Sequence, residues 1–516
     1  MILGGDNAME KTIFEYLENT ANIFPQKIAF IDNTREIDYN SFLNESKLIA
    51  TNILKYNLYN QPIAIYIDKT IECLTSMIGV NYSGNFYTII DTKMPLDRVN
   101  NIFSTLEPKC ILTTKKNMKK LESVKNNYKI IFVDELEKDK VDEIDLKNAR
   151  NKIIDTNPMY VLFTSGSTGN PKGTVLSHRA VISYVLWYKE TFNINENTIF
   201  GSQTPFYFSM SVSDVFSTMI SGATLCIIPK MLFSFPVKLI EYLNEHKVNT
   251  IYWVPSALCI VANFKTLDYI LPETLEKVLF AGEVMPMKQF NIWKNKLPNI
   301  MYANLFGPTE TTDICSYYIV DREFKDTETL PIGRHCENCD LIVLKEDNTP
   351  AKINEEGELC ARGSFLSSGY YKNPEKTSEV FVQNPLNNAY PEIIYRTGDI
   401  VKTNENNEII YVSRKDFQIK HMGYRIELGE IESAVNAITS VETCVCVYDQ
   451  EHSKIVSFYK SNELDDMQIL EGAKSKLPQY MWPNEIIKLD RIPYNANGKI
   501  DRKLLKQNYM NNLYLK

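Results

Sequence analysis

Apolar segments of strand length alternate with helix-like segments up to about residue 283, and this alternation restricts the fold more than any other feature. Residues 11–24 (KTIFEYLENTANIF) carry apolar side chains at helical spacing, whereas PIAIYI (62–67) and NFYTIID (85–91) are typical of buried strands. The other strand candidates are KCILTT, KIIFVD, PMYVLFTS, ATLCIIP, TIYWVPS and KVLFAGE. Strands alternating with helices predict an α/β fold with parallel sheets and crossover connections.

The pattern changes in the last third of the chain. From about Leu341, the segments DLIVLK, GELCARG and EIIYVS predict meandering β-structure. From about Lys415, two helix patterns (GEIESAVNAI and DMQILEGAKSKL) and two strand patterns (VETCVCVYD and KIVSFYK) predict a compact α+β domain. The candidate boundary is Arg414-Lys415-Asp416.

Length and composition exclude several classes of protein. The 516 residues are 44% hydrophobic and 23% charged, as in a soluble globular protein of more than one domain. No run of roughly 18 apolar residues is present, and the N-terminus lacks the pattern of a secretory signal. The net charge of −8 argues against nucleic-acid binding. We therefore expect a cytoplasmic protein with neither a nucleic-acid nor a membrane partner.

The ten cysteines are scattered, as expected of reduced thiols. Cys336 and Cys339, in HCENC, have the CxxC spacing of zinc and redox sites. A zinc site would need a second pair, and a redox site would need a thioredoxin-like setting. The sequence shows neither a second such pair nor a thioredoxin-like setting, so we expect Cys336 and Cys339 to be two unpaired thiols.

The stretch LFTSGSTGNPKG (162–173) follows a predicted strand and combines hydroxyls, glycines and a lysine. Glycine lets backbone N–H groups approach a ligand closely, and the lysine adds positive charge. The stretch is not a Walker A loop, because GxxxxGK[ST] is absent. It predicts a phosphate-binding loop built from Thr164, Ser165, Gly166, Ser167, Thr168 and Lys172.

Three further motifs each carry one charged group suited to nucleotide chemistry. Glu310 in NLFGPTETT (304–312) could hold Mg²⁺ between phosphates, and Asp399 in YRTGD could accept hydrogen bonds from ribose hydroxyls. Lys499 in NANGKIDR (495–502) could neutralise charge on a carboxylate and a phosphate as they react. Taken singly, each could equally be a turn, a salt bridge or a solvated lysine.

These four motifs in this order, together with RKDFQIKHMGYRIELGEIE (414–432), resemble the adenylate-forming superfamily over essentially the whole chain. More narrowly, they resemble stand-alone amino-acid adenylation enzymes of nonribosomal peptide assembly and of D-alanyl carrier ligation. The resemblance implies an α/β fold: a large N-terminal domain of sandwiched α/β subdomains plus a distorted β-barrel (residues 9–414). A small mobile α+β C-terminal domain (417–516) would follow a hinge near Asp416.

The resemblance also implies a two-step reaction. A carboxylate attacks the α-phosphate of ATP, and a phosphopantetheine thiol on a carrier protein then takes the acyl group. Lys499 would serve the first step, and the face from Lys420 to Gly423 would replace it after rotation of the small domain. Glu310 would bind Mg²⁺. The residues implied for ATP are Thr164, Ser165, Gly166, Ser167, Thr168 and Lys172 for phosphates, Thr309 and Thr311 facing the nucleotide, Gly282, Glu283 and Asn304 for adenine, and Asp399 with Arg414 nearby for ribose.

The acid pocket departs from the family pattern in FYFSMSVSDVF (206–216). The family usually carries an aspartate where Ser209 stands, and that aspartate pairs with the α-ammonium of the substrate. A buried ammonium without a partner is costly, so the departure bears on the substrate. The other pocket positions, carried over by spacing, are Met210, Ser213, Tyr252, Leu279, Ala281, Leu305, Gly307, Asp313 and Ile314.

Asp313 is the charged member of this set, and it motivates the hypothesis that the substrate is an amino acid with a displaced amine. A β-amino acid or an acid with a distal amine would fit. The competing hypothesis is an aryl or hydroxyaryl acid, with Tyr252 stacked on its ring and Asp313 accepting from a phenol. Asp313 could instead face Mg²⁺-bound water or a neighbouring loop, and Asp214 could bind the α-ammonium of an ordinary amino acid.

Two other readings remain. An acyl-CoA synthetase of the same superfamily is the nearest rival, although GYRIELGEIE and NANGKIDR resemble the carrier-loading branch more closely. A nucleotide-binding protein without activity is the non-enzymatic rival, and Lys172, Glu310, Asp399 and Lys499 argue against it. By resemblance, we expect a monomer or weak dimer.

Overall fold

The computed structural model describes residues 10–122, 128–136, 141–165, 171–494 and 500–514. The chain divides into two compact units, which are described separately. The first comprises the residues up to Thr92 with Leu106–Leu162 and Gly173–Ser413. The second comprises Lys93–Thr105, Phe163–Lys172 and the residues from Arg414 onward. The predicted domain bounds and the hinge at Asp416 stay predictions.

Among the described residues, a nine-stranded sheet runs through the first unit. Its strands between β13 and β1 are parallel, and the strands at both edges are antiparallel. Their spatial order is β15 (Arg334–His335), β14 (Ser316–Ile319), β13 (Met301–Phe306), β12 (Lys277–Phe280), β11 (Thr250–Trp253), β9 (Ile199–Ser202), β10 (Thr224–Ile227), β1 (Ile28–Ile31) and β2 (Glu36–Asp38).

The described part of the chain also forms a six-stranded sheet, mainly from the first unit. Its strands from β6 to β7 are parallel. In spatial order they are β6 (Lys129–Phe132), β5 (Cys110–Thr113), β3 (Pro62–Tyr66), β4 (Phe86–Ile89), β7 (Pro158–Thr164) and β8 (Lys172–Ser177). The predicted parallel α/β architecture is therefore confirmed. Its strands read as apolar runs in the sequence because parallel strands are buried on both faces.

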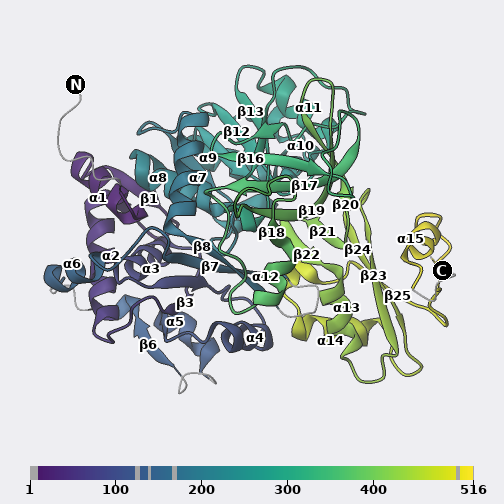
Figure 1. Cartoon of the computed structure of the whole chain (residues 1–516), viewed down its shortest axis with the longest axis horizontal. Helices are drawn as coiled ribbons and strands as arrows, with labels where there is room; N and C mark the ends of the chain where they lie inside the picture. Colours follow the sequence, from purple (N-terminus) through teal and green to yellow (C-terminus); the bar gives the residue numbers. More distant parts are fainter. Residues whose placement is uncertain (1–9, 123–127, 137–140, 166–170, 495–499, 515–516) are drawn as a thin grey trace. The chain divides into compact units, whose positions relative to one another are not determined.

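Helices of the first unit connect and cover these strands. Helix α2 packs on α3, α1 and α7 pack on α8, and α10 packs on α11 (Figure 1). At Gly79 of α3 a Cβ would lie 2.7 Å from Ile49 of α2, so only glycine allows this approach. The helices are α1 (Ile13–Ile23), α2 (Tyr39–Leu54), α3 (Ile71–Tyr82), α5 (Lys115–Met118), α6 (Glu143–Arg150), α7 (His178–Thr191), α8 (Ser211–Ser221), α9 (Pro236–Glu245), α10 (Pro255–Asn263), α11 (Met287–Lys296) and α12 (Pro374–Val380).

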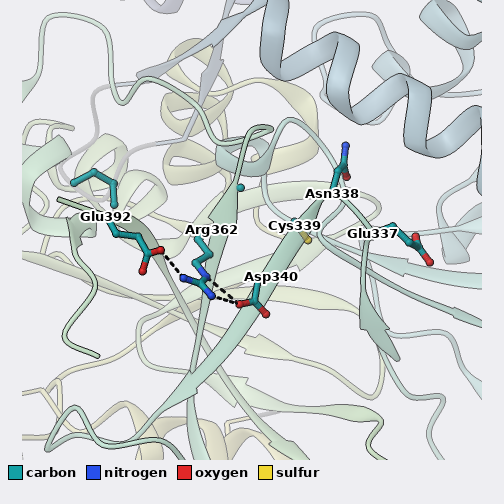
Figure 2. A pocket seen from close by; sticks show the side chains of 8 residues that line it. Glu337, Asn338, Cys339, Asp340, Arg362 and Glu392 are labelled. Carbon is teal, nitrogen blue, oxygen red and sulfur yellow. Dashed lines mark hydrogen bonds and ion pairs between the residues drawn. The ribbon is translucent and has the colours of Figure 1, made fainter. Parts of the chain in front are cut away.

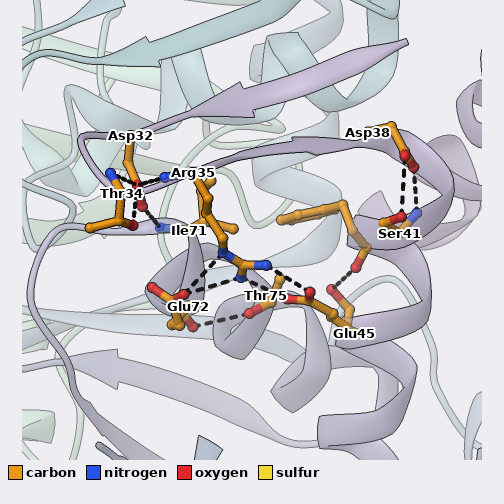
Figure 3. Close-up of polar contacts among 11 residues, drawn as sticks. Asp32, Thr34, Arg35, Asp38, Ser41, Glu45, Ile71, Glu72 and Thr75 are labelled. Carbon is orange, nitrogen blue, oxygen red and sulfur yellow. Dashed lines mark hydrogen bonds and ion pairs between the residues drawn. The ribbon is translucent and has the colours of Figure 1, made fainter. Parts of the chain in front are cut away.

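A polar network fixes the turn between β1 and β2 to the neighbouring helices. Arg35 donates to both carboxylate oxygens of Glu45 on α2 at 2.8 Å and forms an ion pair with Glu72 on α3 (Figure 3). Asp32 accepts backbone hydrogen bonds from Thr34, Arg35 and Ile71. The turn is thus held by side chains and does not depend on apolar packing alone.

The last part of the first unit is a curled antiparallel sheet, which corresponds to the predicted distorted β-barrel. Its path is β16 (Cys339–Leu344), β17 (Glu356–Gly363), β19 (Ile393–Thr403) and β18 (Phe381–Gln383), with β20 (Ile409–Arg414) beside β19. Apart from Lys345 and Glu408, the segments DLIVLK, GELCARG and EIIYVS lie in its strands, as the sequence predicts.

The second unit is α+β, as expected. Apolar residues of its helices and strands, among them Ile431, Val435 and Ile469, form its own core. Arg502 pairs with the buried Glu432 and fixes the start of the last helix to this core. The elements are α4 (Leu96–Leu106), β21 (Gln418–His421), β22 (Tyr424–Glu427), α13 (Leu428–Asn436), β23 (Thr443–Asp449), β24 (Lys454–Lys460), α14 (Asp466–Lys476), β25 (Glu485–Lys488) and α15 (Arg502–Met510).

Throughout the residues that the structure describes, every helix falls short of the length and apolar character that crossing a bilayer requires.

Candidate active site

Asp313 lies within a buried group of hydroxyls in the first unit and is 2% exposed. Its Oδ2 accepts hydrogen bonds from Ser213 at 2.8 Å, Tyr252 at 3.0 Å and Tyr184 at 3.1 Å. The hydroxyls of Ser213 and Tyr184 are also hydrogen-bonded to each other at 2.7 Å. The fold therefore brings three predicted pocket residues together from α8, β11 and the segment after β13.

The Asp313 carboxylate is ionised near neutral pH, but its negative charge is surrounded by neutral hydroxyl groups. Burial raises the pKa of Asp313 to about 6, and hydrogen bonds from Ser213, Tyr252, Tyr184 and Ser209 limit the rise. Burial also raises the pKa values of Tyr184 and Tyr252 well above 10, so both phenols stay protonated and donate. Hydroxyl donors solvate the negative charge but supply no positive charge.

Parallel strand ends position the apolar pocket residues. Tyr252 on β11 lies opposite Leu279 on β12, which in turn lies opposite Ala303 on β13. The carboxyl ends of parallel strands meet at one edge of a sheet, where ligands commonly bind. The buried pocket positions on or beside these strands and α8 are Met210, Leu279, Ala281, Leu305 and Ile314, whereas Ser209 and Gly307 are partly exposed.

The backbone around Asp313 is tightly constrained. A Cβ on Gly307 would lie 2.3 Å from the carbonyl oxygen of Asp313 and 2.6 Å from Cα of Ile314, so residue 307 must be glycine. Thr312 has φ +68°, which is rare for a β-branched residue. Its hydroxyl donates to the carbonyl of Phe365 at 2.7 Å and holds that conformation.

Ser209 lies at the start of the pocket, just before α8. Its hydroxyl accepts a hydrogen bond from Thr309 at 3.3 Å and also contributes to lowering the pKa of Asp313. The neutral side chain at position 209 and the charged one at position 313 thus belong to the same polar group.

Glu310 is fully buried, and its Oε1 accepts a 2.6 Å hydrogen bond from Tyr370. The backbone carbonyl of Glu310 accepts from the Ser367 N–H at 2.9 Å. Mg²⁺ in nucleotide sites is commonly held by one or two carboxylates with phosphate oxygens and waters. A single oriented carboxylate beside the hydroxyls of Thr309 and Thr311 fits such a site.

The residues implied for adenine and ribose are ordered by local contacts. Asn304 donates to the Pro331 carbonyl at 2.8 Å, and Glu283 accepts from the Ser256 N–H at 2.9 Å. Gly282, between β12 and Glu283, has φ +91°. Thr311 donates to the Pro308 carbonyl at 2.9 Å, and Asp399 is buried with its N–H on Thr397 Oγ1 at 3.0 Å.

Other predicted residues belong to the second unit. Ser165 donates to the backbone carbonyl of Arg425 at 2.7 Å, and Arg425 lies opposite Lys420 in the β21–β22 pair. Arg414 binds both carboxylate oxygens of Asp416, at 2.8 and 2.7 Å. Thr164 ends β7, Lys172 begins β8, and Gly166, Ser167, Thr168 and Lys499 lie outside the described residues.

A separate cavity of about 460 Å³ is lined mainly by polar residues, and no predicted pocket residue lines it (Figure 2). Arg362 forms ion pairs across it with Asp340 and Glu392. Cys339 also lines it, and both Cys336 and Cys339 are free, buried thiols, as the sequence predicts.

The motifs do not reveal two contributors to the site. Tyr184 donates to Asp313 from α7. Tyr370 donates to Glu310, which lies 60 residues earlier in the chain. Neither tyrosine lies in a motif, so only the tertiary structure identifies them.

Comparison with known proteins identifies the family of the chain. The AMP-binding enzyme family model matches residues 17–371. Tyrocidine synthase 1 of Brevibacillus parabrevis is 30% identical over 508 residues, which are 97% of this chain and 45% of that protein. The chain thus spans less than half the length of the first curated relatives that it matches.

Two further likenesses cover nearly the whole of this chain. A D-alanine–D-alanyl carrier protein ligase of Bacillus cytotoxicus is 31% identical over 512 residues, 96% of this chain and 98% of that protein. The structure of PA1221, an NRPS protein containing adenylation and PCP domains, has a TM-score of 0.83 at 20% identity and covers 96% of this chain and 84% of that one. The chain therefore belongs to the AMP-binding enzymes, the AMP-forming ligases of the adenylate-forming superfamily.

Proposed function

We propose that this chain activates a small amino acid with a displaced amine, using ATP, and transfers it as a thioester to the phosphopantetheine arm of a carrier protein. In the first step a carboxylate oxygen of the acid attacks the α-phosphorus of ATP, and the bond to pyrophosphate breaks. In the second step the thiol sulfur attacks the acyl carbon, and AMP leaves. Family membership supports the reaction class, and the pocket supports the substrate class.

The buried carboxylate of Asp313 is the observation that carries the substrate proposal. It accepts hydrogen bonds from neutral hydroxyls, while Ser209 supplies no charge at the usual position. An ammonium on the substrate would complete an ion pair that the hydroxyls leave without a cation. An amine at the β or a distal carbon would lie away from Ser209 and toward Asp313.

The remaining residues have supporting roles in this proposal. Asp399, Asn304 and the segment at Gly282 and Glu283 would bind the nucleoside, and Lys499 would neutralise charge in the first step. Bound Mg²⁺ would stabilise the departing pyrophosphate, and Glu310, oriented by Tyr370, would hold it. Lys420 belongs to the face proposed for the thiol-transfer step.

An aryl or hydroxyaryl acid is the second candidate, because Tyr252 and the hydroxyl group around Asp313 could receive a phenol. A phenol brings no positive charge, so it would leave the charge of Asp313 uncompensated. This difference favours the amine substrate.

Acid-dependent ATP–pyrophosphate exchange tests the proposal across α-amino, β-amino, diamino and hydroxybenzoic acids. We expect a β-amino or distal-amine acid to give the highest kcat/KM and Asp313→Asn to abolish that preference. Asp340→Asn, which removes a carboxylate from the cavity in Figure 2, is the matched control. An aryl acid as best substrate would reject the proposal. Loss of exchange with every acid would favour a nucleotide-binding protein without activity, and loading of free CoA over a carrier would favour an acyl-CoA synthetase.

A further inference from the structure

A second buried acid lies next to the pocket. Asp214 follows Ser213 in the first turn of α8 and is 2% exposed. Its Oδ1 has no hydrogen-bond partner among the described residues. Burial raises its pKa to about 7, while Lys69 and a hydrogen bond from Ser202 lower it and Asp313 raises it further. The negative charges of the two carboxylates therefore repel each other.

Lys69 supplies a cation to this region from a distant part of the chain. It follows β3, and its Nζ donates to the carbonyl oxygen of Ser202 at 2.9 Å and to the hydroxyl of Ser202 at 3.2 Å. It also lies 5.2 Å from the centroid of the Phe206 ring. Burial lowers the pKa of Lys69 to about 8, and Asp214 counteracts that effect. The Ser202 hydroxyl thus accepts from Lys69 and donates toward Asp214.

Among the residues that the structure describes, four tyrosines also face the two acids and are neutral. Tyr160, Tyr184, Tyr188 and Tyr252 approach from β7, α7 and β11, and burial raises the pKa of each phenol well above 10. Within the described part of the chain, the charged groups of this cluster are therefore Lys69, Asp214 and Asp313. With all three ionised, the cluster carries a net charge of −1, which a single ammonium would neutralise.

We propose that Lys69 is a specificity-determining positioning residue, which neutralises Asp214 through Ser202 so that Asp313 alone is left to bind the substrate cation. This inference rests on the proposed function and extends it, because it restricts the pocket to acids that bring one positive charge to Asp313. It also gives Asp214 a role other than binding an α-ammonium.

A double-mutant cycle on Lys69 and Asp214 tests this role, with pyrophosphate exchange by the best amine acid measured from pH 5.5 to 8.5. In Lys69→Met the two acids lose their cation, so their pKa values rise. The acid limb of the profile, where kcat/KM increases with pH, should therefore move to higher pH by about one unit, and kcat/KM at pH 7 should fall roughly tenfold. In Asp214→Asn the unpaired Lys69 competes with the substrate ammonium for Asp313, so the limb moves down and KM rises roughly tenfold.

The double variant decides the question. Removing both charges leaves Asp313 as the single acid, so kcat/KM and the acid limb should return to within about twofold of the parent value. Lys69→Arg should also retain the parental pH profile, because it keeps the charge. A double variant as impaired as the worse single variant would overturn the proposal and make Lys69 a packing residue.

A measurement without substrate separates this proposal from the proposed function. A protein with a carboxyl whose pKa is raised on folding loses stability as pH rises from about 4 through the pKa of that carboxyl in the folded state. The melting temperature of Lys69→Met should therefore fall more steeply with pH than that of the parent protein, and the double variant should lose this extra slope. Equal slopes in the single and double variants would refute the charge role of Lys69. Failure of Asp313→Asn to alter amine-acid exchange would refute the proposed substrate class and the specificity role of Lys69, but not its charge pairing with Asp214, which the melting temperatures test separately.

Discussion

Replacement of Asp313 by asparagine should make the free protein more stable and the enzyme nearly inactive. The pKa of Asp313 rises from 3.8 to about 6 on burial. That rise corresponds to about 3 kcal/mol by which ionisation of this carboxyl opposes folding above pH 6. An amide carries no charge, and the hydroxyls of Ser213, Tyr184 and Tyr252 can rotate to donate to it or accept from it.

The sign of the stability change depends on pH. Below about pH 4 the carboxyl is protonated in the folded and unfolded states, so parent and Asp313→Asn should have similar stability. Between about pH 4 and 6 only the unfolded state loses its proton, so the parent protein loses stability while the variant does not. At pH 8 the variant should be more stable by up to about 3 kcal/mol.

Catalysis should respond in the opposite direction. Removing one partner of a buried ion pair costs about 3 kcal/mol or more, which is roughly a 150-fold loss of kcat/KM for a displaced-amine acid. Chemical denaturation at pH 4 and pH 8 gives the stability, and pyrophosphate exchange gives kcat/KM. A variant that is less stable at pH 8 than the parent, or that retains more than a tenth of its activity, would refute the reasoning. Asp340→Asn should change neither quantity appreciably.

Three other substitutions test the same pocket. Tyr184→Phe removes one hydrogen-bond donor to Asp313, so the pKa of Asp313 should rise. The KM for an amine acid should then increase about fivefold, and the acid side of the pH–rate profile should move to higher pH. An unchanged profile would contradict this. Ser209→Asp returns a carboxylate to the usual α-ammonium position, so pyrophosphate exchange with α-amino acids should rise relative to displaced-amine acids, and no change in that ratio would count against the assigned pocket. Gly307→Ala places a Cβ 2.3 Å from the Asp313 carbonyl, so we expect a loss of about 3 kcal/mol or more in unfolding free energy; wild-type stability would exclude the backbone packing described.

Much of the fold follows from local patterns. The helix at α1 and the strands from β3 to β7 are predicted correctly because apolar side chains recur at helical spacing or form continuous runs between turns. The α+β character of the second unit follows from the same signals. Sheet order does not, because the pairing of β1 with β10 joins segments that no local pattern relates.

The candidate site shows the same division. Tyr252, Leu279 and Leu305 can be assigned to one pocket before the structure is known, because the resemblance to the adenylate-forming superfamily carries them over by their spacing from the motifs. Tyr184 and Lys69 cannot, because each reaches the site from an element without a motif and is identified only by a side-chain contact. Such contributors depend on tertiary packing, which a linear pattern does not encode.

The conformation of Thr312 has a consequence for how this pocket can diverge. The path of the chain past Asp313 is set by Thr312 with its hydrogen bond to Phe365, and by the missing side chain at Gly307. Both of these constraints lie outside the side chain of residue 313. A single codon change at 313 can therefore exchange the chemistry offered to an acid without rebuilding the loop. Descendants of such a chain could change substrate in one step, provided that positions 307 and 312 are retained.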